Sequence, residues 1–282
     1  MNKKIVSMLT VAALAVTLLA GCGSSAQAPA SKSSAPAEGS AAAEDMGTVV
    51  VGTNPTFEPF EYQDDAGKMT GFDLDLMSAI AEDQGFKVDF QSLEFDSLVG
   101  GVQSGAIDAI ISGMSITPER SENVLFSKPY MDASLAIIVD KGSEIKSKDD
   151  LKGKVVAAQI GTTGADECSA LVENGGAADA KLLDNYSTCI QDLKSGGCDA
   201  IIIDLPVGQA YMASHPDEVV MLDDPYVADY YGIAVAKDNQ SLCDAINAGL
   251  DNLIANGKYA EICEKYGLEA PESVLKGTAE AK

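Results

Sequence analysis

Short runs of β-branched residues alternate with longer amphipathic segments along most of this chain, and this alternation constrains the fold more than any other feature. In the first half, strand-like runs cover Thr48–Thr53, Lys87–Gln91 and Ile107–Ser112, and helical patterns cover Phe72–Gln84 and Asp96–Ser104. Strands that alternate with helices form βαβ units, in which helices cover both faces of a parallel sheet. The sequence therefore predicts an α/β protein.

The same alternation repeats after the apolar run Ala133–Val139. The repeated elements are strands at Lys154–Gln159, Lys181–Leu183, Ala200–Ile203 and Val219–Leu222, with helices at Ala165–Asn174, Thr188–Lys194 and Val207–Ala213. A further extended run, Tyr230–Ala236, precedes two helical patterns at 241–256 and 259–266, which Gly257 separates. After Pro271 the pattern stops, and we expect a frayed end.

Two similar halves predict two lobes with two chain crossings between them. We expect residues 46–138 and 232–270 to form lobe 1, residues 139–231 to form lobe 2, and residues 271–282 to form a flexible tail. Two crossings, with strands near 136–140 and 232–236, make a hinge that lets the lobes close around a ligand.

The N-terminus has the layout of an export signal. Lys3 and Lys4 precede an apolar stretch, residues 5–20, that is short for a membrane-spanning helix. The sequence Leu19-Ala20-Gly21-Cys22 resembles the lipobox of bacterial lipoproteins, in which the cysteine thiol takes a diacylglycerol. We therefore expect residues 1–21 to be a signal peptide and Cys22 to be lipidated; the alternative is an ordinary secretory signal with a chance cysteine. Residues 22–45, rich in Ala, Ser, Pro and Gly, are typical of a disordered tether.

The charge balance excludes one class of partner. The chain carries 19 Lys and Arg against 43 Asp and Glu, a net charge of −24. Such a surface repels phosphate backbones, so we expect no nucleic-acid binding.

Metal and nucleophilic chemistry have little support in the sequence. Five cysteines follow Cys22, namely Cys168, Cys189, Cys198, Cys243 and Cys263, and they form no CxxC or Cys/His cluster. They are either buried free thiols or partly paired, with Cys243–Cys263 the candidate bridge. The only histidine, His215, stands in a Ser-His-Pro-Asp turn, so no catalytic triad has a base. We expect no metal and no cofactor.

Two local features have both a structural and a functional interpretation. Gly161-Thr162-Thr163-Gly164 lies between a strand and a helix, where it serves either as a helix cap or as an anion site built from N–H groups and hydroxyls. Arg120 is the only arginine and falls in the first turn of a helix that Thr117 caps. A cation there opposes the helix dipole, so Arg120 is either an inconsequential surface residue or a planar donor for a carboxylate.

The motif Gly71-Phe72-Asp73-Leu74-Asp75-Leu76 resembles the signature of the family 3 extracellular solute-binding proteins, receptors of polar amino-acid ABC importers. Further similar motifs, in order, are Gly52-Thr53-Asn54, Pro59-Phe60-Glu61-Tyr62, Ser112-Gly113-Met114-Ser115-Ile116-Thr117 leading to Arg120, Phe126-Ser127-Lys128-Pro129-Tyr130, Gly161-Thr162-Thr163-Gly164 and Ala200-Ile201-Ile202-Ile203-Asp204. The resemblance covers residues 46–268 and implies the two-lobed, type II periplasmic-binding-protein-like fold with two hinge crossings.

The resemblance also implies roles for individual residues. Arg120 would pair with the α-carboxylate of a free amino acid, helped by Ser115, Thr162 and Thr163. Asp204 would take the α-ammonium, helped by the carbonyl of Ser112 or Gly113, although an Asp at a strand end is also a common helix cap. Phe57 and Phe95 would flank the ligand side chain, unless they are core residues.

Specificity follows less directly. Asn54 and Gln159 stand where some relatives carry Asp and Lys, and two amides suit a neutral polar side chain. Glu58, beside Phe57, is interpreted as a solvated surface acid, with attraction of a ligand cation as the alternative. A glutamine-like ligand is therefore the first expectation and a basic amino acid the second.

The partners implied are the free amino acid, an ABC permease with its ATPase, and the membrane, reached through lipid on Cys22. We expect a monomer that is not an enzyme and that works outside the cytoplasm, at a cell surface or in a periplasm. The alternatives are a cyclohexadienyl-dehydratase-like enzyme, which needs a general acid beside a leaving hydroxyl, and a ligand sensor on the same fold.

Overall fold

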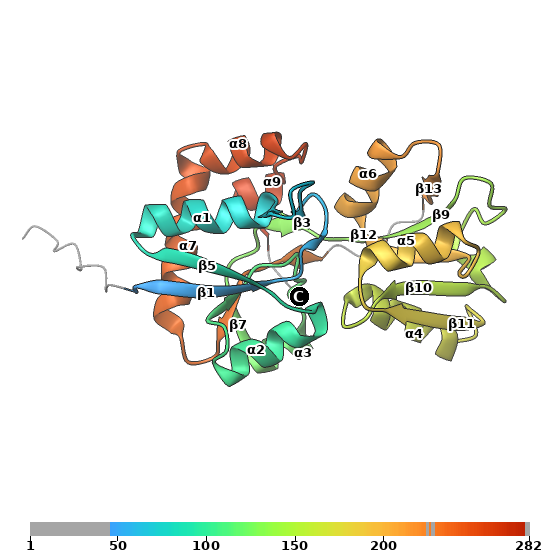
Figure 1. Ribbon diagram of the computed structural model, residues 1–282, viewed down its shortest axis with the longest axis horizontal. Helices are drawn as coiled ribbons and strands as arrows, with labels where there is room; N and C mark the ends of the chain where they lie inside the picture. Colours follow the sequence, from blue (N-terminus) through green and yellow to red (C-terminus); the bar gives the residue numbers. More distant parts are fainter. Residues whose placement is uncertain (1–45, 224–225, 227–228, 280–282) are drawn as a thin grey trace, which may run out of the picture. The chain divides into compact units, whose positions relative to one another are not determined.

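Two five-stranded sheets, each flanked by helices, organise the chain (Figure 1). The computed structural model describes residues 46–223, 226 and 229–279. The predicted signal peptide, Cys22 and the tether lie outside these residues. Among the described residues, no helix has the length and apolar character needed to cross a membrane.

The elements follow one another as the sequence predicts, with small shifts at their ends. The strands are β1 (Thr48–Thr53), β2 (Thr56–Phe57), β3 (Glu61–Gln63), β4 (Met69–Thr70), β5 (Lys87–Ser92), β6 (Ala109–Ile110), β7 (Val124–Phe126), β8 (Met131–Asp132), β9 (Leu135–Asp140), β10 (Val155–Gln159), β11 (Asp179–Leu183), β12 (Ala200–Asp204), β13 (Val219–Met221), β14 (Tyr230–Tyr231) and β15 (Ala234–Ala236). The helices are α1 (Phe72–Gln84), α2 (Leu98–Ser104), α3 (Pro118–Asn123), α4 (Thr163–Glu173), α5 (Tyr186–Lys194), α6 (Leu205–Ser214), α7 (Gln240–Ala255), α8 (Lys258–Lys265) and α9 (Glu272–Leu275), with 3₁₀ turns at Phe95–Ser97 and Lys148–Leu151.

The first sheet has the order β5-β1-β6-β15-β7. Strands β5, β1 and β6 run parallel, whereas β15 is antiparallel to both of its neighbours. Alternate residues of β1 face opposite sides: Val49 and Val51 pack in the same cluster as α1, and Val50 packs with α2. Helices therefore cover both faces, as expected, but the sheet is mixed rather than wholly parallel.

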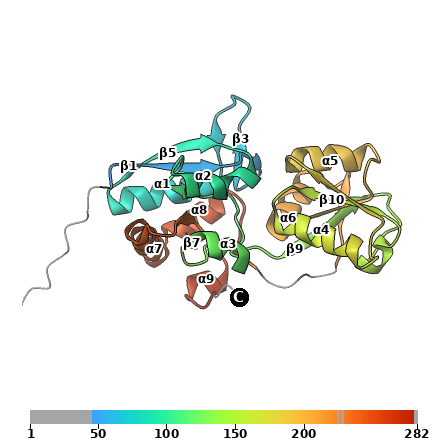
Figure 2. The same ribbon diagram turned by 90° about the horizontal axis from the view of Figure 1, so that it is seen from below.

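The second sheet repeats this plan with the order β11-β10-β12-β9-β13. Its three parallel strands are β11, β10 and β12, and β9 runs antiparallel beside β12. Val156 and Ala158 pack with α4, and Ala157 packs with α5 on the other face. The two similar halves predicted from the sequence are thus two sheets of the same topology, each with its own helices (Figure 2).

The chain passes between the sheets at two places. It leaves β8 of the first lobe, and β9 then lies wholly in the second sheet, so the predicted boundary at 138/139 falls inside a strand. The return passage follows β13, and β14 pairs with β8 before β15 enters the first sheet. The strand before the first passage, β8, thus pairs with the strand after the second passage, β14, and the two form a two-stranded antiparallel ribbon.

A three-stranded hairpin sheet, β2-β3-β4, lies beside the first sheet and leads into α1. The bond between Glu58 and Pro59 in this segment is cis. Gly71 stands before α1 with φ 136°, and a Cβ there would come within 2.1 Å of the Phe60 carbonyl oxygen. Only glycine allows this close approach between the hairpin and the helix.

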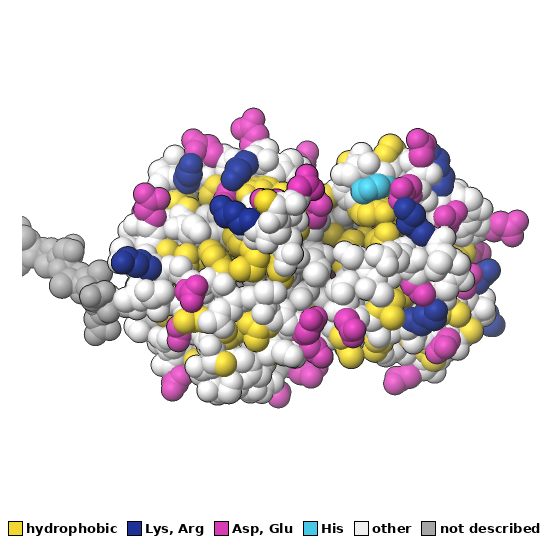
Figure 3. Space-filling view, viewed as in Figure 1, with side chains coloured by type: hydrophobic (Ala, Val, Ile, Leu, Met, Phe, Trp, Pro, Cys, Tyr) yellow, Lys and Arg dark blue, Asp and Glu magenta, His cyan; other side chains and the backbone are white. Residues whose placement is uncertain are grey.

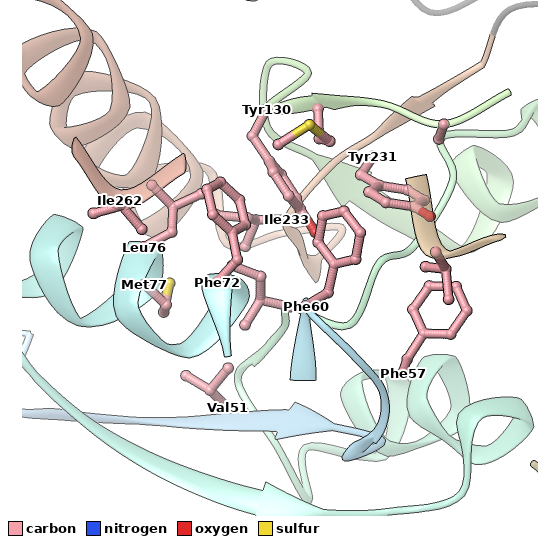
Figure 4. Packing of buried hydrophobic residues seen from close by; sticks show 14 of the residues in the cluster. Val51, Phe57, Phe60, Phe72, Leu76, Met77, Tyr130, Tyr231, Ile233 and Ile262 are labelled. Atoms are coloured by element: carbon pink, nitrogen blue, oxygen red, sulfur yellow. The ribbon is translucent and has the colours of Figure 1, made fainter. Parts of the chain in front are cut away.

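Aromatic residues fill the core between the hairpin, α1 and the terminal helices (Figure 4). Phe72 lies edge-on to Phe60 at 5.8 Å and stacks on Tyr130 at 6.2 Å between ring centres. Tyr259 of α8 donates a hydrogen bond of 2.5 Å to the Tyr130 carbonyl. The terminal helices therefore pack on the first lobe.

The described end of the chain differs from the frayed end that we expected. Helix α9 forms after Pro271, because Val274 is buried and the Ser273 hydroxyl donates a hydrogen bond of 2.9 Å to Asp132. Local sequence gives no sign of this packing.

Candidate functional site

The candidate site lies where the parallel strands of both sheets end. Asn54 follows β1, Ser112 and Gly113 follow β6, Gln159 ends β10, and Asp204 ends β12. In sheets with helices on both faces, the carboxyl ends of parallel strands point toward a shared crevice, which is where such proteins bind ligands. The fold therefore brings these polar residues together from distant parts of the chain.

One cavity is lined by residues from both lobes. Its lining consists of Asn54, Phe57, Glu61, Phe95, Ser112, Gly113, Ser115, Arg120, Gln159, Thr162, Thr163 and Asp204. All eleven ligand-binding residues predicted from the sequence line this cavity, and Glu61 joins them. Glu58, which the sequence placed at the surface, is exposed and is not part of the lining.

Arg120 is held in the cavity from several sides. Thr117 caps α3 by accepting a hydrogen bond of 3.1 Å from the Arg120 backbone N–H. The guanidinium donates to the Ser115 carbonyl at 2.7 Å and to the Gly161 carbonyl of the other lobe at 2.9 Å, and it lies 5.5 Å from the centre of the Phe95 ring. Burial lowers the pKa of Arg120, and Asp204 acts in the opposite direction. No acid among the described residues forms an ion pair with this guanidinium, so it can bind an anion.

Asp204 supplies the opposite charge. Its side chain is 6% exposed, and its Oδ1 atom has no hydrogen-bond partner among the described residues. Burial raises the pKa of Asp204 to about 7, while the nearby Tyr231 hydroxyl and Arg120 lower it. It does not cap α6 through its side chain. A ligand cation would relieve this unpaired buried acid, because an opposite charge favours the ionised form.

The N-terminus of α4 forms a further part of the wall. Thr162 is its N-cap: the hydroxyl accepts a hydrogen bond of 3.2 Å from the Ala165 N–H and donates one of 2.7 Å to the Gln159 carbonyl. Thr162 is therefore a cap and also a cavity residue, so the two interpretations of the glycine-flanked turn are compatible. Thr163 begins the helix and lines the cavity with it.

The two amides predicted to read the ligand side chain contact each other. Gln159 Nε2 donates to Asn54 Oδ1 at 3.0 Å, and the Asn54 amide donates to the Leu93 carbonyl at 2.8 Å. Both residues line the cavity, but much of their hydrogen-bonding capacity is used within the protein. The bond between Gln159 and Asn54 joins the lobes, as the Arg120–Gly161 bond does.

Sequence reasoning missed Glu61 as a site residue. It lies on β3, is 1% exposed, and accepts a hydrogen bond of 2.9 Å from the Ser112 hydroxyl. The signal available was an acid between two aromatic residues, Phe60 and Tyr62, at an inward-facing position of a short strand.

The remaining candidates for chemistry lie away from the cavity. The five cysteines are buried and free, and burial raises the pKa of Cys168, Cys189 and Cys198 to about 12. His215 follows α6 and stacks on Tyr211 at 4.3 Å. Within the described ranges, no group of His, Cys, Asp and Glu side chains is placed to hold a metal ion.

The surface in Figure 3 carries acidic side chains spread over the visible face rather than gathered in one patch. Several are paired with lysines, such as Lys194 with Glu218 at 2.8 Å and Lys148 with Glu167 at 2.6 Å. The negative charge on this face is therefore spread over the surface rather than gathered at one site.

Comparison with known proteins agrees with this geometry. The model of the bacterial extracellular solute-binding proteins, family 3, matches residues 49–269. A probable histidine-binding protein of Neisseria gonorrhoeae is 33% identical over 94% of this chain and 96% of its own length. The glutamine-binding protein GlnH of an ABC transporter of Bacillus subtilis is 33% identical over 95% of this chain and 99% of its own. The structure of an ancestral arginine-binding protein bound to arginine is 43% identical, covers 78% of this chain and 98% of its own, and superimposes with a TM-score of 0.74. The chain therefore belongs to family 3 of the bacterial extracellular solute-binding proteins.

Proposed function

We propose that this protein captures a free polar L-amino acid outside the cytoplasm and delivers it, unchanged, to an ABC importer. The observation that supports this most is that Arg120 and Asp204, two oppositely charged side chains without ion-pair partners among the described residues, line one cavity. A zwitterion carries the complementary pair of charges. Arg120, with Ser115 and the start of α4, would hold the carboxylate, and Asp204, with the Ser112 or Gly113 carbonyl, the ammonium.

For the side chain of the bound amino acid, we propose only a broad class, a polar group. Relatives named for histidine, glutamine and arginine share the fold, and the paired amides of Asn54 and Gln159 suit a neutral polar group. Phe57 and Phe95 would supply apolar walls. A glutamine-like ligand remains the first expectation and a basic amino acid the second.

Closure of the two lobes is the proposed mechanism of capture. The bonds from Arg120 to Gly161 and from Gln159 to Asn54 join the lobes across the cavity. Rotation about the two passages, between β8 and β9 and between β13 and β14, would break these bonds and admit the ligand. Closure removes water from around the two ion pairs and so strengthens them.

Anchoring by lipid on Cys22 and a monomeric state complete the proposal. The tether would keep the domain near its permease and ATPase at a cell surface or in a periplasm. Replacement of Cys22 by Ala should release the exported protein from the membrane fraction, and retention of the variant there would contradict lipid anchoring.

Two experiments test the central proposal. Calorimetry measures binding of each of the twenty amino acids, and product analysis after incubation with the protein shows whether the amino acid is altered. At least one should bind tightly and be recovered unchanged. The proposal fails if none binds, and turnover of a cyclic dicarboxylic acid would support the enzymatic alternative instead.

A further inference from the structure

Two buried carboxyl groups lie side by side beneath the cavity. Glu61 of β3 is 1% exposed and forms part of the lining. Asp73, in the first turn of α1, is fully buried behind it. The Ser112 hydroxyl and the Gly113 N–H, from adjacent residues, donate to the two carboxyl groups and so hold them close together, where each affects the pKa of the other. Two carboxyl groups can hydrogen-bond each other only when a proton lies between them.

The hydrogen bonds that Glu61 and Asp73 accept from other residues indicate which of their oxygens would share a proton. The Ser112 hydroxyl donates to Glu61 Oε1 at 2.9 Å, and Asp73 Oδ2 accepts from the Gly113 N–H at 2.8 Å and from the Tyr130 hydroxyl at 2.9 Å. The two remaining oxygens, Glu61 Oε2 and Asp73 Oδ1, have no donor among the described residues. Buried polar atoms are rarely left unsatisfied, and a single proton shared by these two oxygens satisfies both.

Burial and the charges of the neighbouring groups favour one proton on the Glu61–Asp73 pair. Burial raises the pKa of Glu61 well above its usual range, and it raises the pKa of Asp73 to about 6 against the opposing effect of the Gly113 and Tyr130 hydrogen bonds. The other titratable groups whose charges are coupled to the pair are Asp204, Tyr130, Tyr231 and Tyr259, none of which is a cation. No ion pair in the described part of the chain includes Glu61 or Asp73. Burial and the absence of a paired cation among the described residues therefore favour retention of one proton on the pair.

We propose that Glu61 and Asp73 form a one-proton pair that matches the charge of the ligand side chain: the proton stays on Glu61 opposite a neutral side chain and moves to Asp73 opposite a cationic one. This proposal rests on the proposed function, because it assigns the third ionisable group of the same cavity. With Arg120 and Asp204 assigned to the ligand backbone, Glu61 is the only other ionisable side chain in the lining.

The transfer needs no partner outside the pair. The proton passes along the hydrogen bond from Glu61 Oε2 to Asp73 Oδ1, and the negative charge moves the opposite way, so nothing is released. In the first state the Gly113 N–H and Tyr130 hydroxyl stabilise the Asp73 carboxylate. In the second, the ligand cation and the Ser112 hydroxyl stabilise the Glu61 carboxylate. The buried charge is thus hydrogen-bonded in both states.

Arginine and citrulline provide a matched pair of probes, because they have nearly the same shape and differ in the charge of the side chain. E61Q keeps an amide that can donate to Asp73 and accept from Ser112, but it cannot carry a negative charge. We expect the ratio of the citrulline Kd to the arginine Kd to fall at least tenfold in E61Q relative to wild type. The matched control is E58Q, which removes an exposed acid three residues away and should leave the ratio unchanged. An unchanged ratio in E61Q, or wild-type protein that binds other amino acids but neither of these two, would overturn the proposal.

A measurement without ligand separates this proposal from the proposed function. Infrared spectroscopy at pH 8.5, where Asp204 is ionised, should show a protonated carboxyl band in wild type that E61Q removes, with thermal unfolding confirming that the variant is folded. Absence of the band overturns the shared proton even if ligands bind. Presence of the band, with no amino acid bound, would support the shared proton while the proposed function fails.

Discussion

The side-chain amide of Gln159 donates a hydrogen bond of 3.0 Å to Oδ1 of Asn54 and so connects the end of β10 in one sheet with the end of β1 in the other. Both side chains are buried. In the proposed closure this bond would form only when the lobes are closed, so it would stabilise the closed state relative to the open one.

Replacing Gln159 by Leu removes this bond while keeping the bulk of the side chain. A buried hydrogen bond contributes about 1 kcal/mol net, which corresponds to roughly a fivefold weaker ligand affinity if the bond forms only on closure. Calorimetry with the tightest-binding amino acid measures the change. Unaltered affinity would show that the bond does not favour the closed state.

Gly161→Ala should weaken binding by obstructing closure. A Cβ at Gly161 would lie 2.9 Å from Cβ of Asp96, in the opposite lobe, and 3.1 Å from its Cα. The backbone cost of a positive φ, about 1–2 kcal/mol, is a separate effect on folding. Gly175→Ala is the matched control, because Gly175 has φ 70° against 77° for Gly161 but no atom within 4 Å of its Cβ.

Both glycine variants should therefore unfold at a lower temperature, and only Gly161→Ala should bind more weakly, by about tenfold or more. Small-angle scattering with saturating ligand should show it less compact than wild type. Equal affinities for the two variants would contradict the predicted obstruction.

Arg120→Lys should lose most of the affinity although the charge is retained. The guanidinium donates to Ser115 and Gly161 from a rigid planar fork, and an ammonium cannot reproduce that geometry while binding a carboxylate. We expect a loss of about 2–5 kcal/mol, or roughly thirtyfold to several thousandfold in Kd. Lys128→Ala, which removes an exposed cation paired with Asp251, serves as the control and should bind as wild type does.

Ligand affinity should fall as the pH falls below about 7. Burial raises the pKa of Asp204 to about 7 in the ligand-free protein, whereas binding an ammonium requires the carboxylate. Binding therefore releases a proton when Asp204 is protonated, and affinity should drop by up to about tenfold per pH unit below the pKa. Calorimetry from pH 8 to pH 5 measures this, and Asp204→Asn should bind weakly with little dependence on pH.

The stability of the ligand-free protein should show the opposite trend. Because burial raises the pKa of Asp204 to about 7 and that of Asp73 to about 6, the folded state binds protons that the unfolded state releases between about pH 4 and pH 7. The free energy of unfolding should therefore rise as the pH falls from 8 to 5. Thermal unfolding without ligand measures this, and a flat profile in wild type would contradict the raised pKa values.

The ends of some elements could be predicted from sequence to the residue, and others could not. The predicted bounds of β1 and α1 agree with the structure, because each has a strong period and a clear stop, such as Gly85 after α1. The apolar run at 133–139 predicts a strand correctly, but apolarity does not say which sheet it joins. That choice depends on its antiparallel pairing with β12, a contact between residues more than sixty positions apart.

The residues of the site differ in the same way: some are recognisable from their neighbours in sequence, and others only from contacts with residues far along the chain. Arg120 was identifiable because it is the only arginine and because it opposes a helix dipole. Asp73 resembles an ordinary acid that stabilises the start of α1, yet it is fully buried, and its partners Gly113 and Tyr130 lie 40 and 57 residues away. No local pattern indicates that such an acid will meet Glu61.

The position of β15 between β6 and β7 imposes an order on folding as the chain is synthesised. The second sheet is built entirely from residues 135–221, so all of its strands are present before residue 234 emerges. The first sheet begins earlier in the chain but lacks an inner strand until residues 234–236 arrive, because β6 and β7 are joined only through β15. The lobe that starts first is therefore the one that must finish last, and a chain truncated before β15 would leave the β6 and β7 edges of its first sheet open to pairing with other chains.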